Sequence, residues 1–275
     1  MKPAPFDYLL AESMDEALAA LAEAGDAGRV IAGGQSLMAI LNMRLARPDL
    51  LVDISRIPGL AEIRRHDDHV EIGAGVTQAM LLEWPELADT IPLLHHALPH
   101  VGHIQTRNRG TVCGSLCHAD PSSEIPLVLA TLGGEVVLQS KAGRRVLKAS
   151  EFQVGMLTTA RRSDEIAVAA RFPVRKPVTG YAFTEFARRH GDFAIVAVAA
   201  VADRNSVRLG VGGVADVPTV REFAAVSGAA LDEALNAFAW DCGGYDDIHA
   251  TARHRRELVR RLGRDVIEEA LQCRG

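Results

Sequence analysis

The stretch Val30-Ile31-Ala32-Gly33-Gly34-Gln35-Ser36-Leu37 places two adjacent glycines between a short apolar run and a segment with helical spacing. It predicts a strand at Val30 and Ile31, a tight turn at the glycines, and a helix over 37–45 that Ser36 opens. Glycine allows close approach to the backbone, and the first turn of a helix has N–H groups without intrahelical partners. The stretch therefore indicates either an anion-binding turn or a turn that needs glycine for packing alone. It lacks the GxGxxG pattern, so a Rossmann fold is a poor match.

A second glycine-bearing segment, RNRGTVCGSLCHADPSSEIP, runs from Arg107 to Pro126. We expect the wider range 102–126 to be one long irregular loop, because it is dense in Gly, His, Asn, Arg, Ser and Asp. Such a loop inside a compact domain is usually functional. Together with the first turn, this segment could hold one extended ligand from two sides.

The elements around these two segments follow from periodicity, turn residues and caps. In the first part of the chain we expect a helix over 14–24 with Ser13 as its N-cap, a strand over 50–54, hairpins at 61–73 and 135–148, helices over 77–84 and after Pro92, and a strand over 166–172. Arg175-Lys176-Pro177 is a plausible domain boundary. After it we expect strands over 181–186, 193–201 and 207–211, then helices over 231–239 and 251–273.

Composition narrows the class of protein. The chain has 275 residues, 48% of them hydrophobic, and a formal net charge of −5, which argues against non-specific nucleic-acid binding. We expect no transmembrane helix and no signal peptide, because no apolar run has the required length and flanks. The four cysteines form no disulfide-framework pattern, so a cytoplasmic setting is the simplest interpretation.

A third segment, Phe186-Ala187-Arg188-Arg189-His190-Gly191-Asp192-Phe193-Ala194, completes a pattern of three motifs. In this order the motifs closely resemble the FAD-binding medium subunits of molybdenum hydroxylases, a family that includes the flavoprotein of carbon monoxide dehydrogenase and the flavin domain of xanthine dehydrogenase. The resemblance covers essentially the whole chain. It implies an α+β fold: a two-part FAD-binding domain of the vanillyl-alcohol-oxidase-like (PCMH) type over 1–175, with parts at about 1–56 and 57–175, followed by a smaller α/β C-terminal domain over 176–275.

The resemblance also implies which residues contact FAD. The pyrophosphate of FAD would lie on the first glycine turn, and the second segment would supply further contacts. Glu124 would form a hydrogen bond with the ribose side of FAD. Ile166 and Ala167 would lie on a strand edge near the cofactor, and Phe193 would lie near the isoalloxazine ring. The implied set is Ala32, Gly33, Gly34, Gln35, Ser36, Leu37, Val101, Gly110, Thr111, Cys113, Gly114, Ser115, His118, Asp120, Glu124, Ile166, Ala167 and Phe193.

Two positions depart from the family pattern. Cys113 replaces the first glycine of a pair, so either the backbone there is ordinary or the segment is arranged differently. Glu185 lies where some relatives have a cofactor-facing lysine, and a carboxylate cannot supply that positive charge. We therefore do not transfer the role of the lysine to Glu185.

The function that the resemblance implies is electron transfer by FAD within a larger complex. Molybdopterin and [2Fe-2S] clusters would reside on a large and a small partner subunit, in a dimer of heterotrimers, and no residue of this chain need act as an acid or base towards the organic substrate. Two alternatives stay open: a self-sufficient FAD-dependent oxidase, and a non-catalytic dinucleotide-binding protein. The substrate and the terminal electron acceptor also stay open.

Other patterns favour ordinary structural roles. His96 and His100 have a spacing that can suit zinc on a helix, but Pro99 interrupts it, so we expect no metal site. Neither Ser36 nor Ser115 lies in a GxSxG nucleophile elbow, which argues against a serine hydrolase. Cys113 and Cys117 could form a redox pair, although a buried thiol is the default interpretation.

Overall fold

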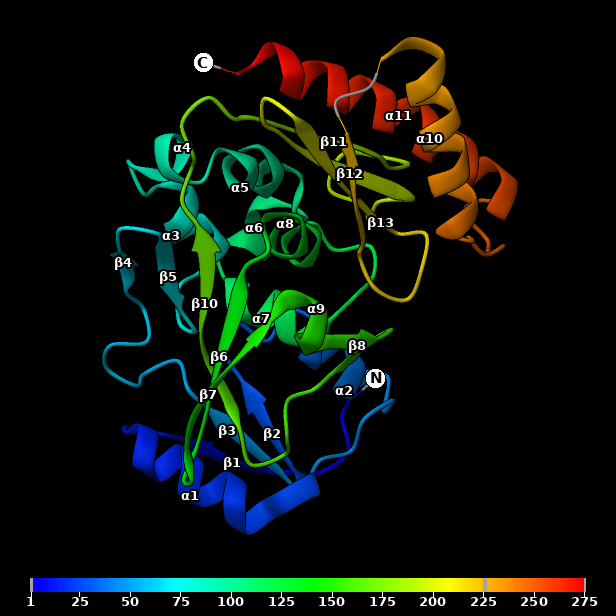
Figure 1. Ribbon diagram of the computed structural model, residues 1–275. Helices are drawn as coiled ribbons and strands as arrows, with labels where there is room; N and C mark the ends of the chain where they lie inside the picture. The colour runs from blue at the N-terminus through cyan, green and yellow to red at the C-terminus, as the bar shows by residue number, and fades with distance from the viewer. Residues whose placement is uncertain (1, 225–226, 275) are drawn as a thin grey trace.

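The computed structural model describes residues 2–224 and 227–274, which form three successive β-sheets with helices packed between and on them (Figure 1). A three-stranded parallel sheet at the N-terminal end is followed by a five-stranded antiparallel sheet and then by a four-stranded antiparallel sheet under two C-terminal helices. The expected α+β architecture with a two-part first domain is confirmed.

The first part is a small βαβ unit with strand order β1-β3-β2. Its elements are β1 (Asp7–Leu10), α1 (Met14–Ala24), the 3-10 turn η1 (Gly25–Ala27), β2 (Gly28–Ile31), α2 (Leu37–Asn42) and β3 (Leu50–Asp53). Helix α1 begins where Ser13 accepts a hydrogen bond from the Glu16 N–H and ends at Gly25, as predicted. Helix α2 ends at Asn42 and not at Leu45, and strand β1 was not predicted.

The second part is a twisted five-stranded sheet with strand order β4-β5-β10-β6-β7. Its strands are β4 (Ile63–Arg65), β5 (His69–Gly73), β6 (Glu135–Ser140), β7 (Gly143–Lys148) and β10 (Ile166–Pro173). A short helix α9 (Ala149–Phe152) and a two-stranded hairpin, β8 (Gln153–Gly155) and β9 (Thr158–Thr159), lie between β7 and β10. Both predicted hairpins are confirmed. Strand β10 is the central strand of this sheet, and Ile166 and Ala167 are its first two residues.

A group of short helices separates β5 from β6. These are α3 (Gln78–Leu82), α4 (Leu87–Thr90), α5 (Pro92–Ala97), the 3-10 turn η2 (Leu98–His100), α6 (Ile104–Arg107), α7 (Val112–His118) and α8 (Glu124–Leu132). The prediction of one irregular loop over 102–126 is therefore wrong. Local hydrogen bonds explain the difference, because Thr111 caps α7 through the Gly114 N–H and Ala119 ends that helix in the left-handed conformation (φ 53°).

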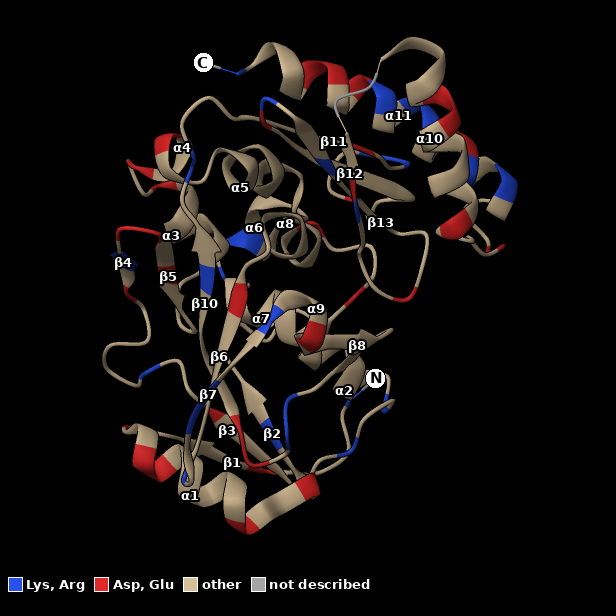
Figure 2. Ribbon diagram, viewed as in Figure 1, with Lys and Arg blue, Asp and Glu red and all other residues tan. Residues whose placement is uncertain are grey.

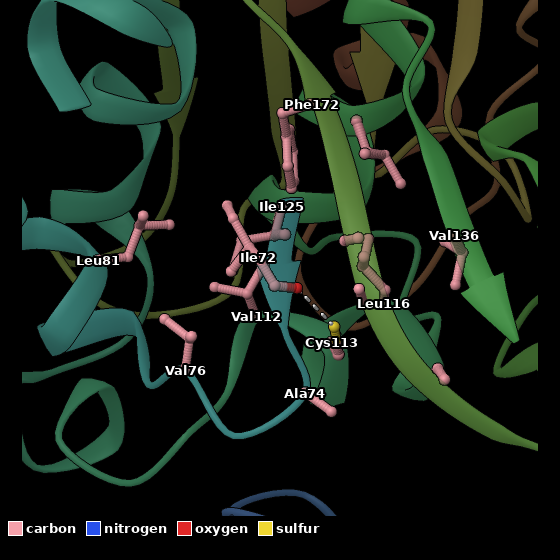
Figure 3. Packing of buried hydrophobic residues seen from close by; sticks show 14 of the residues in the cluster. Ile72, Ala74, Val76, Leu81, Val112, Cys113, Leu116, Ile125, Val136 and Phe172 are labelled. Carbon is pink, nitrogen blue, oxygen red and sulfur yellow. Dashed lines mark hydrogen bonds between the residues drawn. The ribbon is translucent and has the colours of Figure 1, made fainter. Parts of the chain in front are cut away.

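The main core lies between this sheet and the short helices (Figure 3). Cys113 shows how the second glycine-bearing segment contributes to it. The residue is helical with ordinary backbone angles, and its buried thiol donates to the carbonyl oxygen of Ile72 at 3.6 Å. Cys113 therefore has an ordinary backbone conformation, which was the first of the two possibilities for this position. The side chain of Cys113 belongs to the core.

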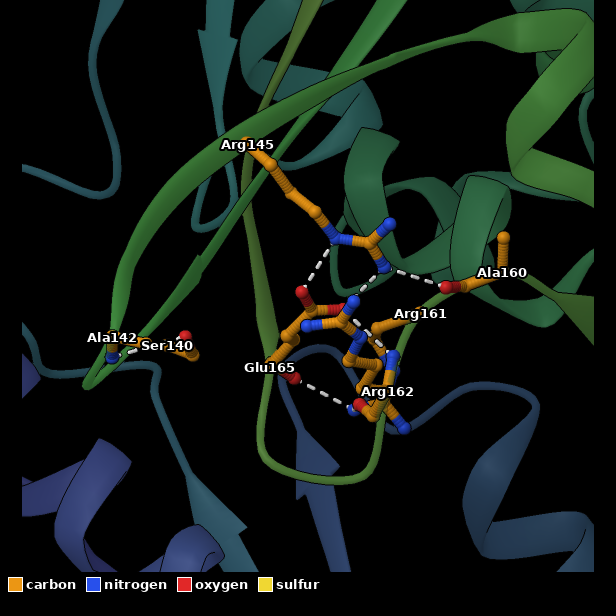
Figure 4. Close-up of polar contacts among 7 residues, drawn as sticks. All are labelled: Ser140, Ala142, Arg145, Ala160, Arg161, Arg162 and Glu165. Carbon is orange, nitrogen blue, oxygen red and sulfur yellow. Dashed lines mark hydrogen bonds and ion pairs between the residues drawn. The ribbon is translucent and has the colours of Figure 1, made fainter.

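An ion pair between Arg145 of β7 and Glu165 fixes the start of β10 (Figure 4). The guanidinium donates to both carboxylate oxygens at 2.6 and 2.8 Å, and the Arg162 N–H donates to one of them at 2.7 Å. Burial acts to raise the pKa of Glu165, but these hydrogen bonds outweigh burial and hold the pKa below its usual value. Glu165 therefore remains ionised in the folded protein at neutral pH.

The C-terminal part is a four-stranded antiparallel meander covered by two helices. It comprises β11 (Gly180–Phe186), β12 (Val196–Ala202), β13 (Ser206–Gly212), β14 (Thr219–Ala224), α10 (Gly228–Asp241) and α11 (Ala252–Gln272). One face of the sheet contributes to the main core, and the other packs on the helices in a second core. Strand β12 begins at Val196, so the prediction that it starts at Phe193 is wrong, and Phe193 lies in the preceding loop.

Helix α11 is amphipathic, as its sequence predicts. Leu258, Val266 and Ala270 are buried against the sheet, and charged residues occur along the whole helix (Figure 2). Of these charged residues, Arg253, Arg261, Asp265, Glu268 and Glu269 are exposed. None of the helices in the described part of the chain combines the length and the apolar character needed to cross a membrane.

Candidate functional site

The two glycine-bearing segments meet at Gly33. A Cβ atom built on Gly33 would overlap the carbonyl oxygen of Arg109 and would lie 2.9 Å from the Cα of Gly110. No real side chain tolerates that separation, so only glycine allows the two backbones to lie so close. Segments that are far apart in sequence are thus in direct contact.

The turn after β2 presents free backbone donors. The N–H groups of Gly33, Gly34, Gln35 and Ser36 donate to no backbone or side-chain atom among the residues described. Gly34 has φ 71°, a conformation that favours glycine. A cluster of N–H groups of this kind is the arrangement that binds phosphate oxygens.

Gly110 is held from the other side by the start of α3. The Gln78 N–H donates to the Gly110 carbonyl at 2.9 Å, and the Val112 N–H donates to the Val76 carbonyl at 3.1 Å. The buried side chain of Gln78 lies against Gly110, and its Oε1 has no hydrogen-bond partner among the described residues. A buried polar atom without a partner beside a glycine cradle suits a bound polar ligand. Gln78 was not predicted, since nothing local distinguishes it from an ordinary helix residue.

The third motif also reaches this region. Gly191 has φ 85°, and a Cβ there would overlap the ring of His103 and lie 2.9 Å from the Gly102 carbonyl oxygen. Arg107 donates to the carbonyls of Val101 and Gly102 at 3.0 and 2.9 Å, which fixes the segment that Gly191 contacts. All three motifs therefore lie together around residues 101–110.

The turn between α7 and α8 is held by the C-terminal sheet. Asp120 accepts a hydrogen bond from the Ser122 N–H at 2.8 Å, and its other oxygen lies 3.9 Å from His118 Nε2. The Gly213 N–H, at the end of β13, donates to the Pro121 carbonyl at 2.8 Å. His118 and Asp120 are thus brought together at the boundary between the first domain and the C-terminal sheet.

Glu124, the first residue of α8, is buried without a cationic partner among the described residues. Burial, and after it the negative charge of Glu185, raises the pKa of Glu124 to about 8. The carboxyl group is therefore mostly protonated at neutral pH and can donate a hydrogen bond as well as accept one.

Comparison with known proteins identifies the family. Residues 4–175 match the model of the FAD binding domain in molybdopterin dehydrogenase, and residues 181–270 match the CO dehydrogenase flavoprotein C-terminal domain. The chain belongs to the FAD-binding medium subunits of molybdenum hydroxylases. It is an oxidoreductase subunit, and FAD is its cofactor.

Three relatives show how far the similarity of this flavoprotein subunit extends. It is 36% identical to the 6-hydroxypseudooxynicotine dehydrogenase complex subunit alpha of Paenarthrobacter nicotinovorans, over 98% of this chain and 96% of the relative. It is 37% identical to the nicotine 6-hydroxylase medium subunit of the same organism, over 98% and 99%. A structure of carbon monoxide dehydrogenase from Hydrogenophaga pseudoflava superposes with a TM-score of 0.94 at 28% identity, covering all of both chains.

The predicted cofactor residues of this flavoprotein subunit fall into two groups. Those that the structure places around the contact between the motifs or on the adjoining turns are Ala32, Gly33, Gly34, Gln35, Ser36, Leu37, Val101, Gly110, Thr111, Gly114, Ser115, His118, Asp120 and Glu124. The side chains of Cys113, Ile166 and Ala167 instead lie in the main core, to which the side chain of Val101 also belongs. Phe193 is 66% exposed in the loop that carries Gly191.

The thiols of the flavoprotein subunit are poorly suited to redox exchange. All four cysteines are free. Burial raises the pKa of Cys113 well above its ordinary value and that of Cys117 to about 11. Neither is a thiolate at neutral pH, and the thiolate is the reactive form.

An apolar cavity of the flavoprotein subunit lies away from these residues. It has a volume of about 270 Å³ and is lined mainly by apolar side chains of α7, α8 and α9 and by residues 217–220. None of the predicted cofactor residues lines it. The glycine turns and the unpartnered Gln78 oxygen, and not this cavity, fit a long polar ligand such as FAD.

Proposed function

We propose that the flavoprotein subunit holds FAD along the contact between its three motifs. The free N–H groups of Gly33–Ser36 would bind the pyrophosphate, and the segment from Gly110 to Ser115 would lie against the opposite side of the cofactor. The overlap that a side chain on Gly33 would make with the Arg109 carbonyl supports this proposal most directly, because it brings two glycine-rich backbones together.

Further contacts would come from buried groups beside the glycine turns. The Gln78 oxygen has no partner among the described residues and would accept a hydrogen bond from the ligand. Glu124 carries a proton at neutral pH and would donate to a ligand oxygen. Phe193, exposed at the end of the third motif, would cover part of the isoalloxazine ring from the C-terminal side.

FAD, when bound, can accept electrons singly and release them singly or in pairs, which suits it to connect iron–sulfur clusters with an external acceptor. The chain's own residues bind and orient the cofactor. We propose that the partners are a large molybdopterin subunit and a small iron–sulfur subunit in a dimer of heterotrimers, in the cytoplasm. Relatives that are named as medium subunits support these partners, and four free cysteines are consistent with the compartment.

The decisive experiment measures FAD and its reduction separately. The purified chain is incubated with FAD and desalted, and the absorbance of the retained flavin is compared with the protein concentration. We expect close to one FAD per chain, and slow or no bleaching with an organic substrate until the two partner subunits are added. A chain that retains no flavin would refute the proposed site, and rapid bleaching by substrate alone would favour the self-sufficient oxidase.

A further inference from the structure

The carboxylate of Glu185 is buried where the C-terminal sheet meets the first domain, and it is only half satisfied. Its side chain is 4% exposed, and its Oε1 lies 3.3 Å from Nδ1 of His100. Its Oε2 has no hydrogen-bond partner among the described residues. Since buried polar atoms are normally paired, this oxygen requires an explanation beyond packing.

The alternation of strand β11 places Glu185 on the face towards the first domain. Side chains two residues apart on a strand share a face, so Glu185 points the same way as Phe183 and Tyr181, which belong to the main core. Its cross-strand partner, Ala197, also faces that core. The charged residues of α11 pack on the opposite face of the sheet, where Ala182 lies, and so do not neutralise Glu185.

Two titratable groups, His100 and Glu124, interact with Glu185 directly, and two more, His190 and Asp120, lie beside those two. His100 approaches from η2, and His190, in the loop after β11, has its ring centroid 5.8 Å from that of His100. Glu124 approaches from α8 and Asp120 from the turn before it, and both Glu185 and Asp120 raise the pKa of Glu124. Among the described residues, neither Glu124 nor Glu185 forms an ion pair with lysine or arginine. Neither buried carboxyl group is therefore neutralised by a direct contact with a fixed positive charge.

The same region contains the proposed cofactor contacts. Val101 follows His100 directly, and Glu124 is itself one of those contacts. Gly191, in the loop after β11, lies against Gly102 and His103. Negative charge added to a cofactor in this region would raise the proton affinity of the buried acidic group nearest to it.

We propose that the Glu185–His100 pair is a proton-binding site coupled to the flavin. When the bound FAD is reduced, this pair takes up one proton from solvent. The inference rests on the proposed function. For each FAD, two electrons enter from the reductant and two protons enter from solvent, one onto the cofactor and one onto the pair. Glu124 is already mostly protonated below about pH 7, so it adds little to the proton uptake there.

The test is the pH dependence of the flavin midpoint potential in the full-length, FAD-loaded chain. For a two-electron couple each proton taken up shifts the potential by about 30 mV per pH unit, since a tenfold change in the equilibrium corresponds to 29.6 mV. We expect about 59 mV per pH unit for the native chain between about pH 6 and pH 7, where Glu124 is mostly protonated, and about 30 mV for Glu185→Gln. Glu233→Gln, which removes an exposed carboxylate of α10, is the matched control and should keep the native slope.

A second variant covers the case in which Glu185→Gln does not retain FAD. Glu185→Leu also removes the carboxylate but fills the buried position with an apolar side chain, and it should likewise lose about half of the slope. Equal slopes in the native chain and in whichever of these variants retains flavin would overturn the inference. A native chain that binds no FAD would instead refute the proposed function, so the two failures are distinguishable.

Discussion

The carbonyl group of Arg109 occupies the space that a side chain on Gly33 would need. This contact joins the turn after β2 to the segment before α7, and it depends on the absence of a single Cβ atom. Both segments belong to the proposed FAD site, so the contact links the packing of the first domain to cofactor binding.

The first prediction concerns Gly33→Ala. The added methyl group must push the Arg109 carbonyl away, which we expect to lower the free energy of unfolding by about 2 kcal/mol and to weaken FAD binding at least about tenfold. Gly33→Val should abolish FAD loading. The measurements are denaturant unfolding of the flavin-free chain and titration of FAD by flavin fluorescence.

Gly155→Ala is the matched control for this change. Its Cβ would meet only the Cβ of Thr158, at 3.8 Å, and its φ is not positive, so neither stability nor FAD affinity should change appreciably. Native FAD occupancy in a folded Gly33→Val protein would remove this turn from the site.

A second prediction follows from the protonated carboxyl of Glu124. Its pKa is about 8 in the folded chain against an ordinary value of 4.5, so its contribution to stability is fully present below about pH 4.5 and is lost as pH rises through about 8. The loss is at most about 1.4 kcal/mol per pH unit. Glu124→Gln lacks this titration and should become progressively more stable than the native flavin-free chain between pH 5 and pH 8.

Urea unfolding of the two proteins at pH 5, 6.5 and 8 measures this difference. Glu23→Gln, which changes an exposed residue of α1, should show the same pH dependence as the native chain. A stability difference between Glu124→Gln and the native protein that does not vary with pH would show that Glu124 is ionised in the folded chain.

The third prediction concerns Arg255, which is only 2% exposed although it lies on a helix rich in charge. It donates to the carbonyls of Ile195 and Gly213 at 2.6 and 2.8 Å and to Asp247 at 2.6 Å. It thereby joins α11 to the one end of this antiparallel strand pair at which β12 begins and β13 ends. Arg255→Met leaves these acceptors buried without a donor and should lower the free energy of unfolding by about 3 kcal/mol.

The exposed Arg253 of the same helix supplies the control. Arg253→Met should change stability by less than about 0.5 kcal/mol in the same thermal or denaturant assay. If the two arginine variants were equally stable, the hydrogen bonds of Arg255 would have no net effect on folding.

A fourth prediction concerns the ion pair between Arg145 and Glu165. Arg145→Met leaves the buried carboxylate without its main donor and should cost about 3 kcal/mol at neutral pH. Because the pKa of Glu165 is depressed in the folded chain, the stabilisation is present above its ordinary pKa and is lost as pH falls through the folded value. The gap between native and variant stability should therefore narrow below about pH 4.5.

Acid titration of both proteins by circular dichroism at fixed urea provides the measurement. Arg144→Met, next to Arg145 on the exposed end of β7, should behave like the native chain. A gap that stayed constant down to pH 3 would assign the effect of Arg145 to packing and not to charge.

The sequence by itself determined the features that act over a few residues. Ser13 and Gly25 mark the ends of α1, the hairpins of the second sheet follow from alternation and turn residues, and the amphipathic pattern of α11 predicts its buried face. The three motifs also sufficed to recognise the family. Each of these signals depends on local hydrogen bonding or on a periodicity that any chain of that sequence carries.

Only the tertiary structure decided which distant residues meet. Two such contacts are those of Gly33 with Arg109 and of Glu185 with His100, which join residues remote in sequence. Arg255 is another case, because it is buried although the helix around it is rich in charged residues. The exposed position of Phe193 was missed for the same reason, whereas α7 within 102–126 is set by local hydrogen bonds such as the Thr111 cap. Burial and long-range hydrogen bonds, which fix these features, depend on how the sheets pack against one another, and no short stretch of sequence encodes that packing.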